Sequence, residues 1–504
     1  MCYLWFTEDT CTQQNKKKNP FPFCFVFVYP YLCIMKAAIK KYAPLILVIV
    51  WGIVCWGFFQ FCYSYHFYYQ EQNQIFLLSW EHISQYLAPC GWLSKLIGDF
   101  LTQFYYYLYV GPVILTGCLL LLGHFLQRLL HRCGAGKWIA LLVAMIVMTL
   151  FAVFCFHHNY RLSNIISAAG LAGMFLLATL LWKKRNWLRI LLAFVIAITG
   201  CYLFGKPEMG KLQQPNFFVE KQLAVDNEYF FKNYDKVISL VENDPHPTQE
   251  MKFFYNLVRA QQGQLPDYLM RFDNNELGTF YKIGPETPLF TIKSMNELYW
   301  VLGDMTFTER AAMMANVFSP ENRNVRMIRR LAECNMVSQD TIAANKYLRI
   351  LDKTLVYRSW AGNIRKHGQT IYKEKIQLVN HHDTITVSDN AHFLMMQLLD
   401  TNPDNTIALD YILCSNLLLK DIENFKRDYD RYCIDTGKPR LKTLYQEALC
   451  IWLAGTDAPQ EEWEKYIQRA DVFQRFQQYN EQRGHPRFKG TYWYYFDKSK
   501  APKV

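Results

Sequence analysis

The residues best suited to chemistry in this sequence are acidic, imidazole and guanidinium side chains that flank apolar stretches. Glu71, Glu81 and Asp99 lie between the first two apolar stretches, and His157 and Arg161 lie in a short turn between two later ones. Carboxylates and imidazoles can transfer protons, and an arginine can hold an anionic group, where a fold gathers them in a cleft. Such groups are catalytic only in a special environment, and otherwise they meet water and lipid headgroups. The sequence therefore leaves these five as candidates and assigns none a catalytic role.

Familiar catalytic and ligand-binding signatures are missing from the sequence. No GxSxG, HExxH, SxxK or P-loop pattern occurs, and the Gly136-Lys137 pair lacks the spacing of a phosphate-binding loop. The cysteines and histidines do not follow the spacing of a zinc site. We interpret His381-His382-Asp383 as part of a solvated loop. We therefore expect neither a cofactor nor a bound metal.

Five apolar runs decide on which side of a membrane the candidate residues lie. Each run is close to the ~20 residues that a helix needs to cross a hydrocarbon core of about 30 Å. None carries a charge in its interior, where it would be costly, and Arg189 lies close enough to an end to snorkel. Five such runs in succession are typical of a membrane protein. They span residues 43–62, 110–126, 138–156, 165–182 and 187–204.

The basic residues between the runs predict the orientation. Every strongly basic loop falls on the same side, and the positive-inside rule makes that side cytoplasmic. With the N-terminus inside, five crossings place everything after Phe204 outside. The residues concerned are Lys36, Lys40 and Lys41 before the first run, Arg128, Arg132 and Lys137 after the second, and Lys183, Lys184 and Arg185 after the fourth.

The composition divides the chain into two unlike parts. Of the 504 residues 51% are hydrophobic, yet the mean hydropathy is only -0.06, because a polar part follows the apolar one. We predict an all-α protein with a transmembrane domain over residues 35–205, which includes a long outer segment 63–109, and a helical domain over residues 206–504. Residues 1–34 are expected to be a poorly ordered extension or, alternatively, to include a short helix lying at the interface, with translation starting at Met1 or at Met35. The formal charge of +11 belongs largely to the cytoplasmic flanks, and no nucleic-acid motif accompanies it, so we expect no nucleic acid as a partner.

Repeated helical pairs are the main feature of the polar part. In residues 230–238, 331–351 and 402–411 a helix ends at a short polar turn and another begins with small and aromatic residues, and residues 444–452 continue the set. These units resemble degenerate tetratricopeptide repeats, which stack into an α-solenoid. An irregular array of helical hairpins is the alternative. Residues 278–294 and 381–390 are expected to be long loops or a small hairpin.

Three further expectations concern packing. Residues 92–104 place apolar side chains at helical spacing, with Lys95, Asp99 and Gln103 opposite, which predicts a helix lying on the outer leaflet or, alternatively, a re-entrant segment. The aromatic residues 492–496 should pack back onto the array or the membrane surface. The predicted helical domain contains four cysteines, Cys334, Cys414, Cys433 and Cys450. We expect them to be mostly buried thiols, and one disulfide among the four is the alternative.

Four short motifs resemble those of a bacterial family of multi-spanning inner-membrane proteins of unknown function, with a periplasmic, tetratricopeptide-like tail. They are Glu71–Phe76, Phe100–Phe104, Arg330–Glu333 and Lys346–Leu351. The resemblance implies a place in the inner membrane with the helical domain in the periplasm.

The function expected is that of a membrane-anchored scaffold, which presents the helical array to a protein partner of the envelope and needs no enzymatic activity. The alternative is an envelope enzyme or transport accessory that acts on a lipid or lipid-linked glycan at the outer face. An enzyme should gather the five candidate residues in one pocket, and a scaffold should leave them scattered.

Overall fold

The computed structural model describes residues 25–87, 89–182, 187–272, 287–379 and 390–499, and it describes side chains from Tyr42 onward. Within these ranges every regular element is a helix, so the predicted all-α class is confirmed. The chain forms two compact units, residues 1–54 and residues 55–504. The loop residues 183–185, residues 278–286 of the predicted loop 278–294 and the segment 381–389 lie outside the described residues. The prediction of a loop or hairpin is wrong for residues 289–294, which form the start of a helix, α13 (Leu289–Leu302).

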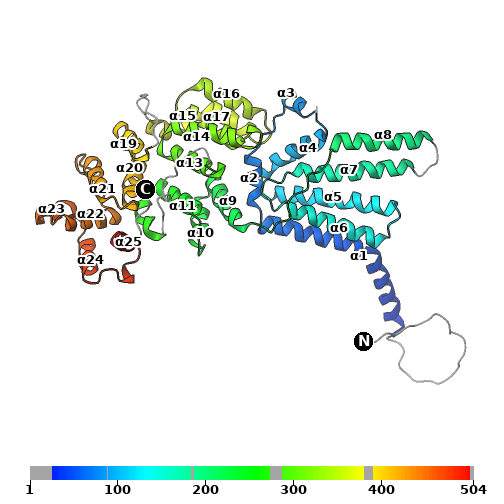
Figure 1. Ribbon diagram of the computed structural model, residues 1–504, viewed down its shortest axis with the longest axis horizontal. Helices are drawn as coiled ribbons and strands as arrows, with labels where there is room; N and C mark the ends of the chain where they lie inside the picture. Colours follow the sequence, from blue (N-terminus) through cyan, green and yellow to red (C-terminus); the bar gives the residue numbers. More distant parts are fainter. Residues whose placement is uncertain (1–24, 88, 183–186, 273–286, 380–389, 500–504) are drawn as a thin grey trace, which may run out of the picture. The chain divides into compact units, whose positions relative to one another are not determined.

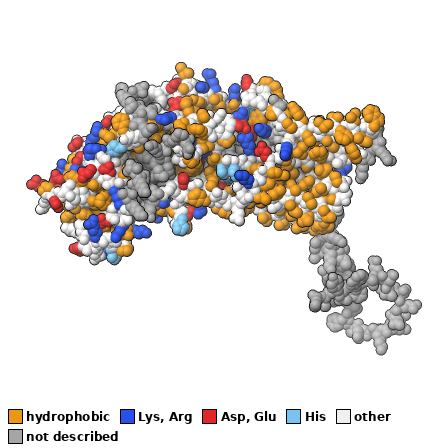
Figure 2. All heavy atoms as spheres, in the orientation of Figure 1, with side chains coloured by type: hydrophobic (Ala, Val, Ile, Leu, Met, Phe, Trp, Pro, Cys, Tyr) orange, Lys and Arg blue, Asp and Glu red, His pale blue; other side chains and the backbone are white. Residues whose placement is uncertain are grey.

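Five helices are long and apolar enough to cross a membrane, as expected. The candidate spans are Tyr42–Phe61, Val110–Arg132, Lys137–Phe154, Leu162–Trp182 and Trp187–Phe204. The first is the end of a longer helix, α1 (Phe25–Phe61), so residues 25–34 of the expected extension are helical. Helices α5 (Val110–Arg132), α6 (Lys137–Phe154), α7 (Leu162–Trp182) and α8 (Trp187–Phe204) form a bundle in which α5 contacts α6 and α7, and α7 contacts α8 (Figure 1). Exposed apolar side chains cover this bundle, whereas charged side chains are scattered over the helices that follow it (Figure 2).

The segment 63–109 folds into short helices between this bundle and the later helices. They are α2 (Tyr65–Gln72), α3 (Trp80–Ile83) and α4 (Trp92–Thr102). The helix expected over residues 92–104 is therefore present, but it packs against α7 and α8 through its small residues. Ser94, Gly98 and Thr102 form the buried face, and a Cβ on Gly98 would lie 2.8 Å from Ser163.

The described part of residues 206–504, for which a helical domain is predicted, forms a series of consecutive helices within the second compact unit. Each of the predicted units 230–238 and 331–351 contains a turn between two helices, at residues 231–233 and 338–340, and residues 402–405 of the unit 402–411 separate α19 from α20. Neighbours along the chain contact one another from α13 to α17, and α11 and α12 also contact α20. The helices of the first half are α9 (Phe217–Phe230), α10 (Tyr234–Glu242), α11 (Gln249–Gln261), α12 (Leu265–Tyr268), α13 (Leu289–Leu302), α14 (Met305–Phe318), α15 (Val325–Val337), α16 (Thr341–Asp352) and α17 (Arg358–Ile371).

The second half of the helical domain ends with the aromatic tail packed on the array. Tyr492 and Trp493 are buried, and the Tyr492 hydroxyl donates to the Leu417 carbonyl at 3.1 Å. Cys334, Cys414, Cys433 and Cys450 are all buried free thiols. The helices are α18 (Lys373–Leu378), α19 (Ala391–Thr401), α20 (Thr406–Leu418), α21 (Ile422–Tyr429), α22 (Thr443–Gly455), α23 (Gln460–Tyr466), α24 (Ala470–Glu481) and α25 (Tyr492–Lys498).

Candidate functional site

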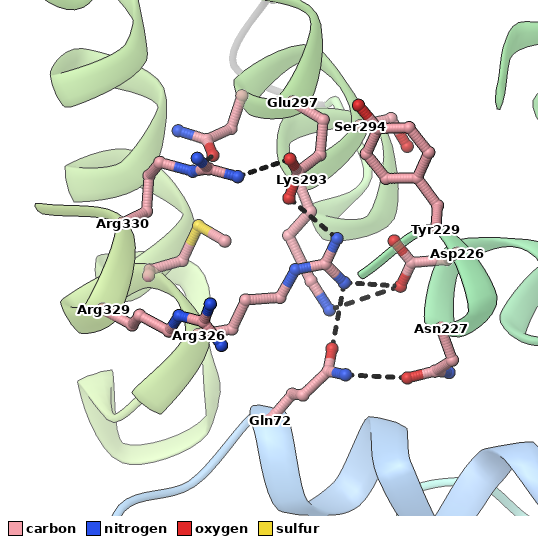
Figure 3. A network of polar contacts seen from close by, with 12 residues as sticks. Gln72, Asp226, Asn227, Tyr229, Lys293, Ser294, Glu297, Arg326, Arg329 and Arg330 are labelled. Atoms are coloured by element: carbon pink, nitrogen blue, oxygen red, sulfur yellow. Dashed lines mark hydrogen bonds and ion pairs between the residues drawn. The ribbon is translucent and has the colours of Figure 1, made fainter. Parts of the chain in front are cut away.

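A buried network of charged and amide side chains joins the segment 63–109 to the helical domain. Arg326 on α15 lies at its centre and is 2% exposed (Figure 3). Its guanidinium donates to Asp226 at 2.8 Å, to Glu297 at 2.9 Å and to the Gln72 amide oxygen at 3.0 Å. Gln72 in turn donates to Asn227 at 2.7 Å. Helices α2, α9, α13 and α15 therefore meet around one arginine.

Glu297, on α13, also binds a second arginine of α15. Arg330 donates to its other carboxylate oxygen and also pairs with Glu333 at 3.0 Å. Burial alone would raise the pKa of Glu297, but Arg330 and Arg326 outweigh burial and lower that pKa to about 2. Removing one member of such a buried set leaves an uncompensated charge, so the network strongly constrains how the four helices meet.

Two further ionisable groups of this region have altered proton affinity. Burial lowers the pKa of Lys293 to about 8; its ammonium lies 3.9 Å from Asp226 and 5.2 Å from the centre of the Tyr69 ring. Burial also raises the pKa of Glu71 to about 8, although the Tyr357 hydroxyl donates to its carboxylate at 3.1 Å. Glu71 is thus held by the helical domain and not displayed at an open surface.

A cavity of about 230 Å³ lies beside this network, where the segment 63–109, the α6–α7 turn and the helical domain meet. We name it the junction pocket. It is smaller than the ~300–1,000 Å³ of pockets that hold drug-sized molecules, so it suits a small polar group. Its lining residues are Tyr69, Gln70, Asn73, Gln74, Ile75, Asp99, Thr102, Asn159, Arg161, Leu162, Pro320, Glu321 and Arg323.

Hydrogen bonds and ion pairs hold the charged residues of the junction pocket in place. Asp99 accepts a hydrogen bond from the Tyr86 hydroxyl at 2.8 Å. Arg161 donates to Glu321 at 2.6 Å, and Arg323 lies 3.4 Å from the other oxygen of Glu321 and 3.4 Å from the Tyr86 hydroxyl. The four charged side chains come from α4, the α6–α7 turn and the loop after α14, so only the complete fold assembles them.

Two acidic groups of the pocket differ in their proton affinity. Burial raises the pKa of Asp99, although the hydrogen bond from Tyr86 and the charge of Arg161 act in the opposite direction. Burial would also raise the pKa of Glu321, but the hydrogen bond and charge of Arg161 outweigh it, so this pKa lies below its ordinary value. The same pocket thus shifts the pKa values of its two carboxyl groups in opposite directions from their ordinary values.

The loop that supplies Glu321 and Arg323 has an unusual backbone. Glu321 and Asn322 are consecutive residues in the left-handed region, with φ of 57° and 55°. This conformation is unfavourable for most non-glycine residues and persists where the surroundings impose it, often at functional sites. Asn324 anchors the end of this loop, because its side chain caps α15 and also donates to Asn73 at 2.9 Å and to Ser319 at 2.8 Å.

Comparison with known proteins assigns the chain to a family. A family model described as a family of unknown function, DUF6057, matches residues 39–210 and 208–499, which include both the candidate spans and the helical domain. The chain belongs to the DUF6057 family. No curated protein and no solved structure matches it. The function of this DUF6057 member must therefore be argued from its own residues.

The five residues singled out in the sequence do not all meet. Asp99 and Arg161 line the junction pocket together. Glu71 is buried against Tyr357, and Glu81 is exposed, with Lys353 at 3.8 Å. His157 stacks on His158, and its ring accepts a hydrogen bond from the Asn159 backbone at 3.2 Å, within the α6–α7 turn. The fold thus brings two of the five into one cavity.

Sequence reasoning missed the residues that the helical domain contributes. Glu321 and Arg323 lie in a turn between two helices, with no local pattern that marks them. For the buried network, α13 is the informative helix, because its residues 292–299 are all buried. Two of them, Lys293 and Glu297, are charged, and charged residues in a helix that is buried on every side indicate that polar partners lie inside the protein.

Metal binding has no support in the described part of the chain. No group of three or more His, Cys, Asp or Glu side chains there could hold a metal ion. The junction pocket offers instead a mixture of carboxylates, guanidinium groups and amides, which is suited to hydrogen bonding with a polar ligand.

Proposed function

We propose that this protein is a multi-pass membrane protein of the bacterial envelope whose junction pocket binds the polar headgroup of a lipid or lipid-linked molecule. The observation that carries the proposal is that Asp99 and Arg161, from separate segments, line one cavity together with Glu321 and Arg323 of the helical domain. The other three candidates, Glu71, Glu81 and His157, lie outside this cavity, so the proposal rests on the pocket residues alone.

The position of the pocket supports a ligand presented by a membrane. Arg161 directly precedes Leu162, the first residue of a candidate span. Exposed apolar side chains also flank the ends of two spans, where they suit the boundary between headgroups and acyl chains: Tyr107, Leu108 and Tyr109 before α5, and Met209 and Leu212 after α8. Met313, Val317 and Phe318 at the end of α14, next to the pocket residues Pro320 and Glu321, are exposed as well.

The orientation proposed is N-terminus in the cytoplasm and helical domain in the periplasm, in the bacterial inner membrane. Arg128, Arg132 and Lys137 at the α5–α6 connection support it, because basic residues are enriched on the cytoplasmic side. The junction pocket would then face the outer leaflet.

Lipids that co-purify with the protein test the proposal. The full-length protein and its Arg161→Ala and Asp99→Ala variants are extracted gently, and their bound lipids are identified by mass spectrometry. We expect one lipid class to be retained by the unmodified protein and depleted in both variants, with Glu81→Ala as the exposed control. Identical lipid profiles in all four proteins would refute the proposal.

A second role, as a scaffold for an envelope protein, is favoured by the consecutive contacts of helices α13 to α17, which resemble a tetratricopeptide-like array. Ile342 on α16 is 85% exposed and gives a probe of that surface. A photo-crosslinking residue at position 342 should yield one defined adduct with a protein partner in cells. The absence of any protein adduct there would leave this surface without a scaffold role.

A further inference from the structure

The charges that line the junction pocket balance one another. Asp99 and Glu321 carry two carboxylates, and Arg161 and Arg323 carry two guanidinium groups. Both guanidinium groups already face Glu321, at 2.6 and 3.4 Å. An anionic ligand binds best to cations that have no acidic partner. In this pocket a phosphate or carboxylate would have to displace Glu321 from the two arginines, and the Asp99 carboxylate would repel it.

The other polar groups of the pocket both donate and accept hydrogen bonds. Gln70, Gln74 and Asn159 contribute side-chain amides, whereas the Thr102 hydroxyl is used within the protein, donating to the Gly98 carbonyl at 2.8 Å. The amide nitrogens of Gln70 and Gln74 already have acceptors within the protein. Gln70 donates to the His158 backbone carbonyl at 2.9 Å, and Gln74 donates to the Asp99 backbone carbonyl at 3.3 Å. Their amide oxygens, like the two carboxylates, are acceptors, which suit a ligand that can donate.

A sugar fits this combination of groups. Each of its hydroxyls donates one hydrogen bond and accepts others, so it can satisfy carboxylates, amides and the remaining guanidinium N–H groups together. An ionised phosphate only accepts, so it could bond the guanidinium N–H groups but not the two carboxylates or the amide oxygens of Gln70 and Gln74. A cavity of about 230 Å³ is also of a size for one small polar group and not for an extended chain.

We infer that the junction pocket selects a neutral polyhydroxylated group, such as the sugar of a glycolipid, over a phosphate or carboxylate headgroup. The inference rests on the proposed function, because it names the chemical class of the headgroup bound at that same pocket. Asp99 accepts from a ligand hydroxyl, and Arg161 and Asn159 donate to ligand oxygens.

Native mass spectrometry of the full-length protein in a polyoxyethylene detergent, which carries no sugar, provides the test. The probes are monoglucosyl diacylglycerol, phosphatidylglycerol with the same acyl chains, and free glucose. The variants are Asp99→Asn, Arg161→Gln and Asn159→Ala, with Glu81→Gln as an exposed control outside the pocket. Asn159 is exposed, so its truncation tests the pocket even if changes at Asp99 disturb folding.

The inference predicts that the glucolipid binds at least about tenfold more tightly than phosphatidylglycerol. Asp99→Asn and Arg161→Gln should each weaken glucolipid binding by about tenfold or more, as expected for loss of a hydrogen bond to a charged group. Asn159→Ala should weaken it by a smaller factor, and Glu81→Gln should leave it unchanged.

The opposing outcomes separate the inference from the proposed function. Tighter binding of phosphatidylglycerol, weakened by Arg161→Gln, would overturn the choice of a sugar and leave headgroup binding intact. Free glucose binding as tightly as the glucolipid would support the sugar and overturn a membrane-presented ligand. Binding of both lipids that no pocket variant changes would overturn the inference and the proposed function together.

Discussion

The Tyr357 hydroxyl donates to the Glu71 carboxylate at 3.1 Å, across 286 positions of sequence. The contact ties the segment between the first two candidate spans to α17 of the helical domain. Both side chains are buried, and burial raises the pKa of Glu71 to about 8. At neutral pH the folded protein therefore holds Glu71 in its protonated form, with consequences for stability.

Stability should fall with rising pH through the titration of Glu71. The unfolded chain releases this proton near the ordinary value of 4.5, whereas the folded protein keeps it up to about pH 8. Between these values the folded state binds more protons, so the free energy of unfolding decreases as pH rises. Glu71→Gln keeps an acceptor for Tyr357 and cannot ionise, so it should reduce this loss by on the order of 1–3 kcal/mol between about pH 5 and 8.

Apparent melting temperatures in nanodiscs over this pH range measure the effect. Glu81→Gln serves as the control, because Glu81 is exposed and its change should leave the pH dependence as it was. If the melting temperatures of Glu71→Gln and the unmodified protein changed with pH in the same way, Glu71 would be ionised in the folded state.

Arg326 should be among the residues least tolerant of substitution. Arg326→Ala leaves Asp226 and Glu297 buried without their central partner, which should lower the free energy of unfolding by about 3–5 kcal/mol. Arg365 provides a matched control, because it pairs with Asp352 at 2.5 Å but both side chains are partly exposed. Arg365→Ala should cost less than about 1 kcal/mol. Limited proteolysis would detect the loosening, and equal resistance of the two variants would refute a structural role for the network.

The close packing of α4 against α7 predicts the effect of adding one methyl group at Gly98. A Cβ on Gly98 would lie 2.8 Å from the backbone of Ser163, so Gly98→Ala forces the helices apart and should destabilise the protein by about 1–3 kcal/mol. Gly362 in α17 has nothing within 4 Å of such a Cβ. Gly362→Ala should therefore be neutral or stabilise by up to about 1 kcal/mol, through helix propensity. Thermal unfolding of both variants distinguishes the two environments, and similar shifts would contradict the close packing.

Some of this architecture is encoded locally and some is not. Four of the candidate spans were predictable within three residues, because apolar composition over about 20 residues is a local property, whereas the second extends six residues beyond its predicted end, to Arg132. The turn between α9 and α10 was predictable for the same reason, since its polar residues interrupt two helical patterns. The helix over residues 92–102 was also predicted, but its packing face was not. Ser94, Gly98 and Thr102 are informative only once α7 is known to lie against them.

The candidate site shows the same division. Asp99 and Arg161 were identified because they flank apolar runs, but Glu321 and Arg323 come from a turn more than 150 residues later. Charged residues in helices, such as Arg329 and Arg330, resemble a solvated face when only the sequence is considered. Their burial depends on α9 and α13, which pack against α15 through long-range contacts that one sequence does not reveal.

Two exposed cysteines test the proposed orientation. Cys90 lies in the segment 63–109, and Cys133 lies in the connection between α5 and α6. In intact spheroplasts a membrane-impermeant maleimide should label Cys90 and spare Cys133. Cys90→Ser should therefore reduce labelling, whereas Cys133→Ser should reduce it only after the membrane is opened. The reverse pattern would place the helical domain in the cytoplasm.

The end of α14 should touch lipid if the junction pocket lies at the membrane boundary. Met313, Val317 and Phe318 are 45%, 59% and 54% exposed, and the adjoining loop reaches Arg161 through Glu321 at 2.6 Å. Apolar side chains in this position favour the boundary between headgroups and acyl chains. A photo-crosslinking residue at position 318 should therefore form adducts with phospholipid in nanodiscs, detected by mass spectrometry. The same residue at position 441, where Leu441 is 44% exposed in the second half of the helical domain, provides the comparison. An absence of lipid adducts at 318 would place α14 in water, and equal adducts at both positions would show that lipid contact is not specific to the surroundings of the pocket.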